Sequence, residues 1–364
     1  MKPSARYAQG ITAGEWQSDP AQLRVLQSLD RIHTALQTAP VRSSSLLGRL
    51  FGGGSAASSA VQGLYLYGGV GRGKTFLVDL LFDAVEGIPK RRTHFHRFMR
   101  ELHARLRTHQ GERDPLVPIA AELAATARLL VLDEFFVNDI GDAMVLGRLL
   151  DALFAQGVTL VTTSNIEPDG LYKDGLQRAG FLPAIAALKS HCEVLHMDSA
   201  TDYRLRALTQ SPVYRAPLDA QSNAWIAGRF AELTHGHHAS VTPLEINDRE
   251  IAVRGVADGV ARFDFAALCE GPRSPSDYIE IATEFHTVLV GGIPVFDGSN
   301  DDAGRRFVYL IDELYDRRIN LVCTAAADPV SLCTSAKLAM PFERTASRLI
   351  EMQSADYLAS TPDA

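Results

Sequence analysis

The chain has 364 residues, of which 46% are hydrophobic and 22% are charged, and its 36 basic and 43 acidic side chains give a formal charge of −7. This length allows two domains, or one large domain with an extension, and the apolar fraction excludes a wholly disordered chain. No run approaches the roughly 18 apolar residues of a membrane span, and the first residues show neither a signal-peptide nor a transit-peptide pattern. We therefore expect a cytoplasmic protein with at most peripheral membrane contact, whose acidic balance argues against nucleic acid as its main partner.

Residues 1–60 hold one helical pattern, which runs from Asp19 to about Gln37 with apolar residues three and four positions apart. Asp19 is the expected N-cap, because Pro20 follows it at the first helical position. The Ser/Gly/Ala-rich segment 43–60 is expected to be a flexible connector. We therefore expect residues 1–60 to lie outside the first folded domain.

The region from residue 61 to about residue 200 alternates short apolar runs with helical patterns. This alternation is typical of βαβ units and predicts an α/β fold with a parallel sheet flanked by helices. Strands are expected at 63–67, 93–98, 129–133, 158–164 and 192–197, with helices up to Ala84, up to Arg107 and over 142–155.

The region 201–364 has mixed α+β texture. Hairpin strands are expected within 241–255 and at 261–265, followed by a strand at 286–296, a helix over 304–318 and a strand at 319–326. The pattern leaves open whether this region is a separate domain, a lid, or a source of further strands for the preceding sheet.

Two segments of the chain, 149–171 and 310–332, align without gaps, and Thr163 falls on Thr324. Either a helix–strand–turn unit is built twice, or two amphipathic segments resemble each other by chance. Asn165 is replaced by Ala326 in the second segment. A true second copy is therefore expected to be structural rather than chemical.

The segment from Gly68 to Thr75 fits the pattern G-x-x-x-x-G-K-[ST] between an expected strand and an expected helix. Glycines let successive backbone N–H groups surround phosphate oxygens, and the following helix N-terminus adds its dipole. Lys74 can reach the β- and γ-phosphates of a nucleotide, and the Thr75 hydroxyl can ligate Mg²⁺. The expected binding residues are Gly68, Gly69, Val70, Gly71, Arg72, Gly73, Lys74, Thr75 and Phe76.

The apolar run at 129–133 ends in two carboxylates, Asp133 and Glu134. Ligands of open parallel sheets bind at the carboxyl ends of the strands. Asp133 is therefore expected in the Mg²⁺ shell, and Glu134 is expected to polarise the attacking water as general base. The alternative is an ordinary strand end with a solvated acidic pair.

Asn165 ends the next expected strand, where its amide can orient water against the γ-phosphate; a turn-initiating Asn is the alternative. Arg178 lies thirteen positions further on, where an arginine of one subunit could reach a neighbouring site in an oligomer. A solvated helix-end arginine is the rival interpretation.

Arg344 and Arg348 share one face of an expected helix, from which either could contact the γ-phosphate; surface ion pairing is the alternative. The basic segment 93–107 places His94 and His96 on one expected strand face. It could contact a partner, nucleic acid or nucleotide, or be a solvated face.

These motifs, in their order along residues 60–358, resemble the ZapE-type cell-division ATPases of bacteria and their mitochondrial AFG/LACE relatives. The resemblance rests on VGRGKT, HFHRFM, LDEFFVNDI, TTSNIEPDGLYKDGLQR and FERTASRLIEMQSADY. It implies an AAA+ type P-loop ATPase with Lys74 and Thr75 as the Walker A pair, Asp133 and Glu134 as the Walker B pair, and Asn165 as sensor. It makes Arg178 the arginine finger.

The resemblance further implies Mg²⁺-dependent ATP hydrolysis coupled to remodelling of a protein partner, in bacteria the FtsZ division ring, by a self-associating ATPase. A DNA-associated AAA+ ATPase of helicase-loader type is the alternative, kept open by the arginine-rich segment. A GTPase is disfavoured because no N-K-x-D motif follows the phosphate loop. A small-molecule kinase is disfavoured because Glu134 and Asn165 suit the activation of water.

Overall fold

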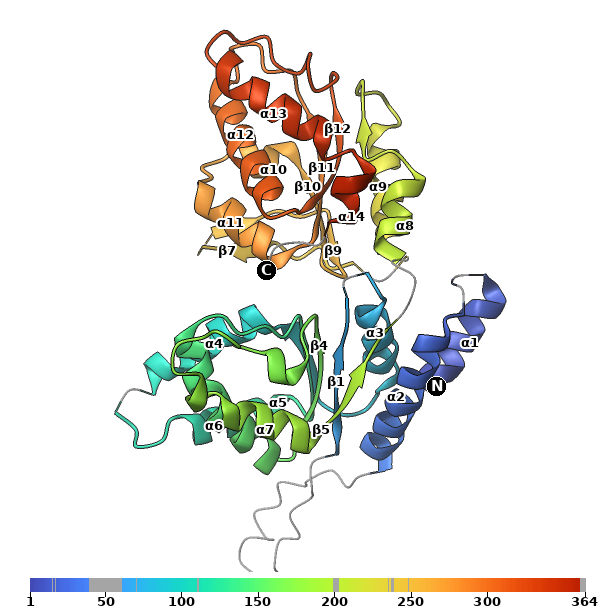
Figure 1. Ribbon diagram of the computed structural model, residues 1–364, viewed down its shortest axis with the longest axis vertical. Helices are drawn as coiled ribbons and strands as arrows, with labels where there is room; N and C mark the ends of the chain where they lie inside the picture. Colours follow the sequence, from blue (N-terminus) through green and yellow to red (C-terminus); the bar gives the residue numbers. More distant parts are fainter. Residues whose placement is uncertain are drawn as a thin grey trace, which may run out of the picture. The chain divides into compact units, whose positions relative to one another are not determined.

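The structure, a computed structural model, describes residues 1–14, 16, 18–38, 61–69, 71–109, 111–198, 203–234, 236, 239–247 and 249–360 (Figure 1). The chain divides into two compact units, Met1–Thr201 and Asp202–Ala364, which are considered separately below. The expected connector at 43–60 falls outside the described residues. Within the described ranges, no helix combines the length and the apolar character needed to cross a membrane.

Unit 1 is built on a five-stranded sheet in which every neighbouring pair is parallel, so the predicted α/β fold is confirmed. The strand order is β2-β3-β4-β1-β5. One strand, β4, therefore separates the strand that precedes the glycine loop from the strand that ends in two carboxylates. The strands are β1 (Gly63–Tyr67), β2 (Lys90–His94), β3 (Leu129–Asp133), β4 (Thr159–Ser164) and β5 (Cys192–His196).

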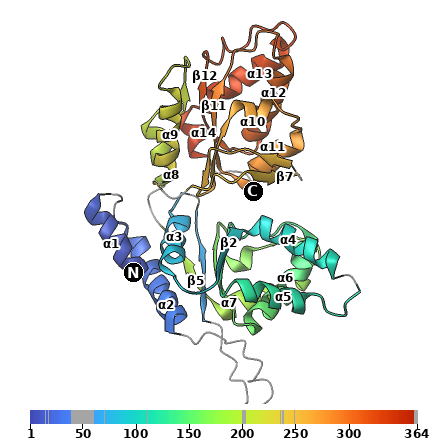
Figure 2. The same cartoon turned by 180° about the vertical axis from the view of Figure 1, so that it is seen from behind.

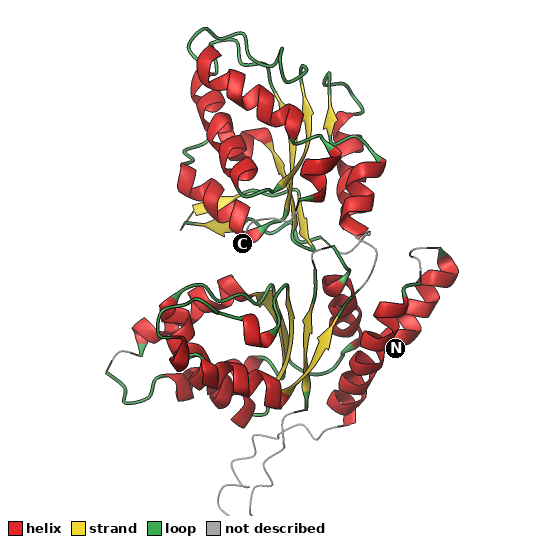
Figure 3. Cartoon of the chain, in the orientation of Figure 1, coloured by secondary structure: helices red, strands yellow, loops and turns green. Residues whose placement is uncertain are grey.

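Helices cover both faces of this sheet (Figures 1 and 3). Successive side chains of β1 point to opposite faces of the sheet, so Leu64 and Leu66 enter one apolar core and Tyr65 enters the other. Both faces are therefore apolar and need helices to cover them. The first core is covered by α1 (Pro3–Ala13), α2 (Pro20–Thr38) and α3 (Lys74–Ala84). The second is covered by α4 (Phe95–Thr108), α5 (Leu116–Thr126), α6 (Ile140–Ala155) and α7 (Leu182–His191).

The N-terminal segment differs from the expectation of one helix outside the folded domain. Two helices form, because Gly14 ends α1 in the left-handed conformation at φ 73°. Asp19 caps α2 as expected, accepting the Ala21 N–H at 2.9 Å. Both helices bury apolar side chains such as Tyr7 and Leu29 in the core beneath α3. Residues of α1 and α2 therefore belong to unit 1.

A second difference concerns β2, which was expected to include His94 and His96 on one face. The strand ends at His94 and α4 begins at Phe95, so His96 is exposed on a helix. Phe95 is buried against Phe135, with ring centroids 4.4 Å apart. The strand expected at 93–98 therefore covers Lys90–His94 instead, and the helix begins inside the expected strand, with the Phe95 ring in the core.

Unit 2 has a sheet of its own, with strand order β6-β12-β11-β10-β9, and a separate hairpin of β7 and β8. Only β9 runs antiparallel within the sheet, which confirms the mixed character expected for this region. The strands are β6 (Tyr214–Arg215), β7 (Leu244–Ile246), β8 (Arg249–Ile251), β9 (Gly255–Ala257), β10 (Val260–Asp264), β11 (Thr287–Ile293) and β12 (Asn320–Ala325).

The helices of unit 2 also enclose two apolar cores, one on each face of its sheet (Figure 2). One face carries α8 (Tyr203–Gln210), α9 (Ser222–Leu233) and α14 (Ala355–Ala359). The other carries α10 (Phe265–Cys269), α11 (Pro275–Glu284), α12 (Asp301–Asp316) and α13 (Ala339–Glu351).

Candidate nucleotide-binding and hydrolysis site

The glycine loop of unit 1 lies between β1 and α3, as expected for a phosphate loop. Gly68 has φ 155°, and a Cβ there would lie 2.4 Å from the Met197 carbonyl oxygen. Gly73 has φ 85°, in the left-handed region that favours glycine. The loop therefore follows a path that side chains at these positions would block. Val70 falls outside the described residues.

Lys74 is the first residue of α3, and its side chain is buried. Its Nζ donates to the carbonyl oxygens of Gly68 and Gly69, each at 2.8 Å, and to Asn165 Oδ1 at 3.0 Å. The ammonium thus joins the phosphate loop to the end of β4, and the structure brings together two residues that lie 91 positions apart. A buried ammonium held by exchangeable oxygen acceptors is suited to bind phosphate oxygens in their place.

The two carboxylates lie at the carboxyl end of β3. Asp133 is almost fully buried, whereas the Glu134 side chain is 42% exposed. Glu134 has φ 54°, and its N–H donates to Thr163 Oγ1 at 3.1 Å. A non-glycine residue in this conformation is uncommon and is found preferentially at functional sites. The chain therefore turns sharply between the buried and the accessible carboxylate.

Arg92 is a site residue that sequence reasoning missed. It lies on β2, donates its Nε to Asp133 Oδ2 at 2.6 Å, and forms a second ion pair with Asp79 of α3. Two residues further along β2, His94 is paired with Asp133 in the β2–β3 register. In the sequence, Arg92 lies directly before the basic segment 93–107, and no motif distinguishes it.

His94 lies near the second carboxylate. Its Nδ1 is 3.8 Å from Glu134 Oε2, beyond hydrogen-bonding distance. The same nitrogen is buried and makes no hydrogen bond within the described part of the chain. The end of β2 therefore places one basic side chain beside each of the two acidic residues.

The oxygen ligands expected for a metal are the Thr75 hydroxyl and the Asp133 carboxylate. Among the described residues, no group of three or more His, Cys, Asp or Glu side chains gathers as it would in an all-protein metal site. One hydroxyl and one carboxylate beside a phosphate loop suit Mg²⁺, which takes most of its ligands from phosphates and water. The residues present therefore fit that cation.

Phe76 has a different environment from the one expected of a nucleotide-binding side chain. Its ring is 8% exposed and packs against Trp16 with centroids 5.0 Å apart, and against Tyr7 at 6.1 Å. The side chain is thus part of the core formed with the N-terminal helices. Only its backbone N–H, in the first turn of α3, lies where the helix N-terminus offers donors.

Arg178 lies in a short 3-10 helix, Arg178–Gly180, and donates its Nη2 to the Asp169 carbonyl oxygen at 2.5 Å. Its Nε is buried and has no hydrogen-bond partner within the described ranges. The guanidinium is therefore held by the loop after β4, and its described hydrogen bond is not to the phosphate loop.

Arg344 and Arg348 lie on α13 of unit 2 and form ion pairs with acidic residues of α12. Both pair with Asp312, and Arg348 also donates to Asp316 at 2.9 Å. Its guanidinium further stacks over the Tyr315 ring at 4.6 Å. These contacts match the ion-pairing alternative weighed for the two arginines.

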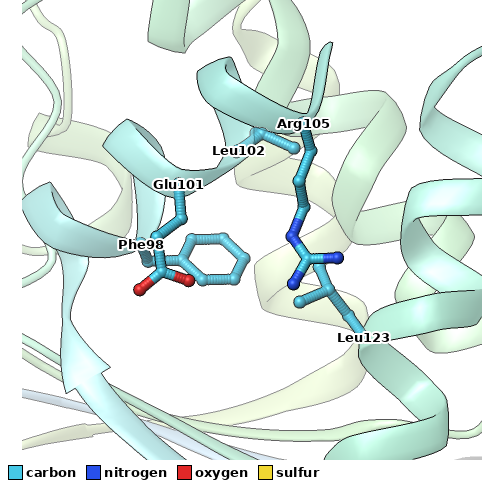
Figure 4. A pocket seen from close by; sticks show the side chains of 5 residues that line it. All are labelled: Phe98, Glu101, Leu102, Arg105 and Leu123. Atoms are coloured by element: carbon cyan, nitrogen blue, oxygen red, sulfur yellow. The ribbon is translucent and has the colours of Figure 1, made fainter. Parts of the chain in front are cut away.

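A shallow depression lies between α4 and α5 and belongs to the basic segment rather than to the phosphate loop. Figure 4 shows the Phe98 ring between the Glu101 and Arg105 side chains, which line the depression together with Leu102 and Leu123. Arg105 pairs with Glu122 at 2.6 Å, and Glu101 pairs with Arg91. Neighbouring carboxylates thus neutralise part of the arginine-rich face.

Comparisons with known proteins place this site in context. A model of the AFG1-like ATPase family matches residues 1–361. The cell division protein ZapE of Escherichia coli (strain K12) is 43% identical over 365 residues, covering 98% of this chain and 97% of that protein. Lactation elevated protein 1 homolog B of Danio rerio is 34% identical over 345 residues, covering 82% of this chain and 69% of that protein. The crystal structure of the DnaC helicase loader is similar to 50% of this chain and 93% of its own, at 14% identity and a TM-score of 0.36, which is too weak to carry an argument.

Proposed function

The chain belongs to the AFG1-like ATPase family, and from this premise we propose that it couples Mg²⁺-dependent ATP hydrolysis at the β1–β3–β4 edge to the remodelling of a protein partner. The observation that carries the proposal is the position of Lys74. Its ammonium contacts Gly68 and Gly69, which follow β1, and also Asn165, which follows β4. Strand β4 is the neighbour of β3, at whose end the two carboxylates lie.

Hydrolysis requires an in-line attack of water on the γ-phosphorus, with proton loss from the water and charge transfer to the leaving oxygen. In the proposed mechanism the loop N–H groups and the α3 N-terminus bind the phosphates, and Lys74 exchanges its carbonyl acceptors for β- and γ-phosphate oxygens. Glu134 accepts the proton of the attacking water, and Asn165 orients that water. Glu134 suits this role because its side chain is accessible while Asp133 is buried.

Asp133 and Thr75 are the residues proposed to hold Mg²⁺. When bound, the cation would neutralise charge that develops on the phosphate oxygens. Asp133 is already held by the Arg92 guanidinium at 2.6 Å. Its carboxylate is therefore held in place by a neighbouring cation before any metal binds.

The proposed partner is a protein of the bacterial division ring, with FtsZ as the candidate. Support comes from the 43% identity to a protein named for cell division, which extends over almost the whole of both chains. We further propose a cytoplasmic location, peripheral membrane contact at most, and no main role in nucleic-acid binding, consistent with the net charge of −7.

Self-association is proposed as part of the mechanism. Arg178 is proposed to act in the site of an adjacent subunit, since its described hydrogen bond is to Asp169 rather than to the phosphate loop of its own chain. An arginine supplied in this way would stabilise negative charge in the transition state.

The test measures steady-state ATP hydrolysis by the full chain with purified FtsZ polymers and, separately, with single-stranded DNA at low and high salt. Lys74→Ala and Glu134→Gln chains are the matched controls for binding and for chemistry. We expect stimulation by the polymers, altered polymer length in return, and loss of both effects in the two variants. Stimulation by DNA alone, declining steeply with salt, would instead support the helicase-loader alternative.

A further inference from the structure

The two units repeat one arrangement of strands and helices. Unit 1 places its first four strands in the order β2-β3-β4-β1, and unit 2 places β10-β11-β12-β6 in the same relation, all parallel. In both units a strand leads directly into a helix, a second helix follows, and a strand–helix–strand segment completes the repeat. The gapless alignment of 149–171 with 310–332 falls on the α6–β4 and α12–β12 segments of this repeat.

The repeat extends to individual hydrogen bonds. Tyr65 on β1 donates its hydroxyl to the Ile166 carbonyl at 2.8 Å, and Tyr214 on β6 donates to the Ala327 carbonyl at 2.7 Å. Ile166 and Ala327 are partners in the gapless alignment, and each tyrosine lies opposite the corresponding position of the next strand. Chance resemblance between two amphipathic segments does not reproduce such pairs, so the chain builds the same unit twice.

The residues of phosphate chemistry are present in the first copy only. By register, Asp133 and Glu134 correspond to Gly291 and Gly292 in unit 2. Ala326 replaces Asn165, and the loop that follows β6 contains neither glycine nor lysine before α9 begins. Unit 2 thus keeps the framework and lacks the functional groups.

One hydrogen bond at the turn that carries Glu134 is nevertheless present in both units. Glu134 N–H donates to Thr163 Oγ1 at 3.1 Å, and Gly292 N–H donates to Thr324 Oγ1 at 2.9 Å. Glu134 and Gly292 both have positive φ, 54° and 78°, and both threonines are buried. The hydroxyl therefore holds the same left-handed turn whether or not that turn carries a side chain.

We propose that Thr163 is a positioning residue for Glu134, and that its hydroxyl holds the strained turn that presents the carboxylate to the nucleotide site. This inference rests on the proposed role of Glu134 as general base. At the equivalent position unit 2 has glycine, for which a positive φ carries no steric cost. Unit 1 has a glutamate there, so surrounding contacts must stabilise its positive φ against the steric cost.

The single Thr163 hydroxyl is suited to hold both acidic residues. While its oxygen accepts from the Glu134 N–H, its proton points to Asp133 Oδ1 at 3.4 Å. The Thr163 carbonyl in addition accepts the Phe135 N–H at 2.7 Å. A valine keeps the shape and the backbone contact of this residue but removes both interactions of the hydroxyl, so it isolates the hydroxyl's contribution.

The experiment compares full-length wild type, Thr163→Val, Thr163→Ser and Thr324→Val, with Glu134→Gln as reference. It measures kcat and KM for ATP, the Kd of a fluorescent ATP analogue, and melting temperature. We expect Thr163→Val to lower kcat at least tenfold while Kd changes less than twofold, and Thr163→Ser to recover most of the loss. Thr324→Val, which removes the same hydrogen bond from unit 2, should keep kcat within twofold of wild type.

A kcat of Thr163→Val within twofold of wild type would overturn the proposal, as would equal losses in the Ser variant or in Thr324→Val. If the valine variant does not fold, Thr163→Ala is measured in its place, and failure of both to fold would mark the residue as purely structural and overturn the proposal as well. Glu134→Gln distinguishes failure of the proposed general base from failure of the positioning role proposed for Thr163. If that variant hydrolyses ATP at the wild-type rate, the proposed general base is wrong; if it stalls while Thr163→Val does not, only the positioning role is wrong.

Discussion

Arg92 on β2 and Asp133 on β3 are joined by a hydrogen bond of 2.6 Å between Nε and Oδ2, and the same guanidinium also pairs with Asp79 on α3. One cation thus links two strands and the helix that follows the phosphate loop. All three side chains are less than a quarter exposed. The ion pairs are therefore shielded from solvent far more than a surface pair is.

Replacement of Arg92 by alanine should destabilise unit 1, because it removes the guanidinium that two shielded carboxylates share. We expect a loss of about 3 kcal/mol in the free energy of unfolding, or roughly 6–12 °C in melting temperature for a unit of this size. Thermal denaturation followed by circular dichroism measures the change. Arg113→Ala, at an exposed position on the loop before α5, is the control and should leave the melting temperature unchanged. Equal melting of the two variants would show that the Arg92 pairs contribute nothing measurable.

Nucleotide stoichiometry follows from the repeat within the chain. Because unit 2 has glycines in place of the acidic pair and no lysine in the loop after β6, we expect one nucleotide per chain. Isothermal titration of the full chain with a non-hydrolysable ATP analogue should give a stoichiometry of one, and Lys74→Ala should abolish binding altogether. Residual binding by the Lys74 variant would point to a second site outside the phosphate loop.

The trans role proposed for Arg178 can be tested by mixing subunits. Arg178→Ala should lose most hydrolysis while still binding ATP, because its hydrogen bond to Asp169 lies outside the phosphate loop. Mixtures with Lys74→Ala subunits, which keep Arg178 but bind no nucleotide, should regain part of the activity. Lys189→Ala is the matched control, since it removes a cation that pairs with the Asp169 side chain, whereas Arg178 donates to the Asp169 backbone carbonyl. No recovery at any mixing ratio would contradict an arginine that acts between subunits.

The cysteines provide a prediction of pH dependence. Burial raises the pKa of Cys192 to about 12, from an ordinary value of 9.0, and also raises the pKa of Cys269 and Cys323. The unfolded chain therefore loses these protons first as the pH rises. Stability that is fully present below pH 9 should decline between pH 9 and 12.

Thiol labelling at pH 8 gives the matching kinetic readout. The half-buried Cys333 should react with a disulfide reagent before the three buried cysteines, which become reactive only on unfolding. Chemical denaturation at pH 8 and at pH 10.5 measures the stability change. Equal stability at the two values, or rapid labelling of all four thiols in the native chain, would contradict the burial.

Much of unit 1 is predictable because its signals are local. The glycines around Lys74 predict the phosphate loop, and the apolar run that ends at Asp133 predicts a buried strand, from residue type and order alone. The Lys74–Asn165 contact follows from the rule that parallel strands end at one edge. Arg92 could not be recognised in this way, since its partners on α3 and β3 are brought to it only by the sheet.

The N-terminal helices and unit 2 illustrate a different limit. Helix α1 is short and mixes small and polar residues, so its periodicity is weak, and its stability comes from packing Tyr7 into the core of unit 1. The alignment of 149–171 with 310–332 leaves two interpretations open in the sequence. The register of β11 and the tyrosine hydrogen bonds distinguish them, and both depend on contacts between residues far apart in the chain.

The N-terminal helices pack against the phosphate loop and are not an appendage to unit 1. A Cβ at Gly73 would lie 2.9 Å from Gln22 Nε2, and Gln22 is itself held by the Tyr7 hydroxyl at 2.7 Å. A shortened chain that starts at residue 61 would retain every letter of the nucleotide motifs and lose the support behind their glycines. For this protein, a domain boundary drawn from the nucleotide motifs alone would remove the N-terminal helices that support the phosphate loop.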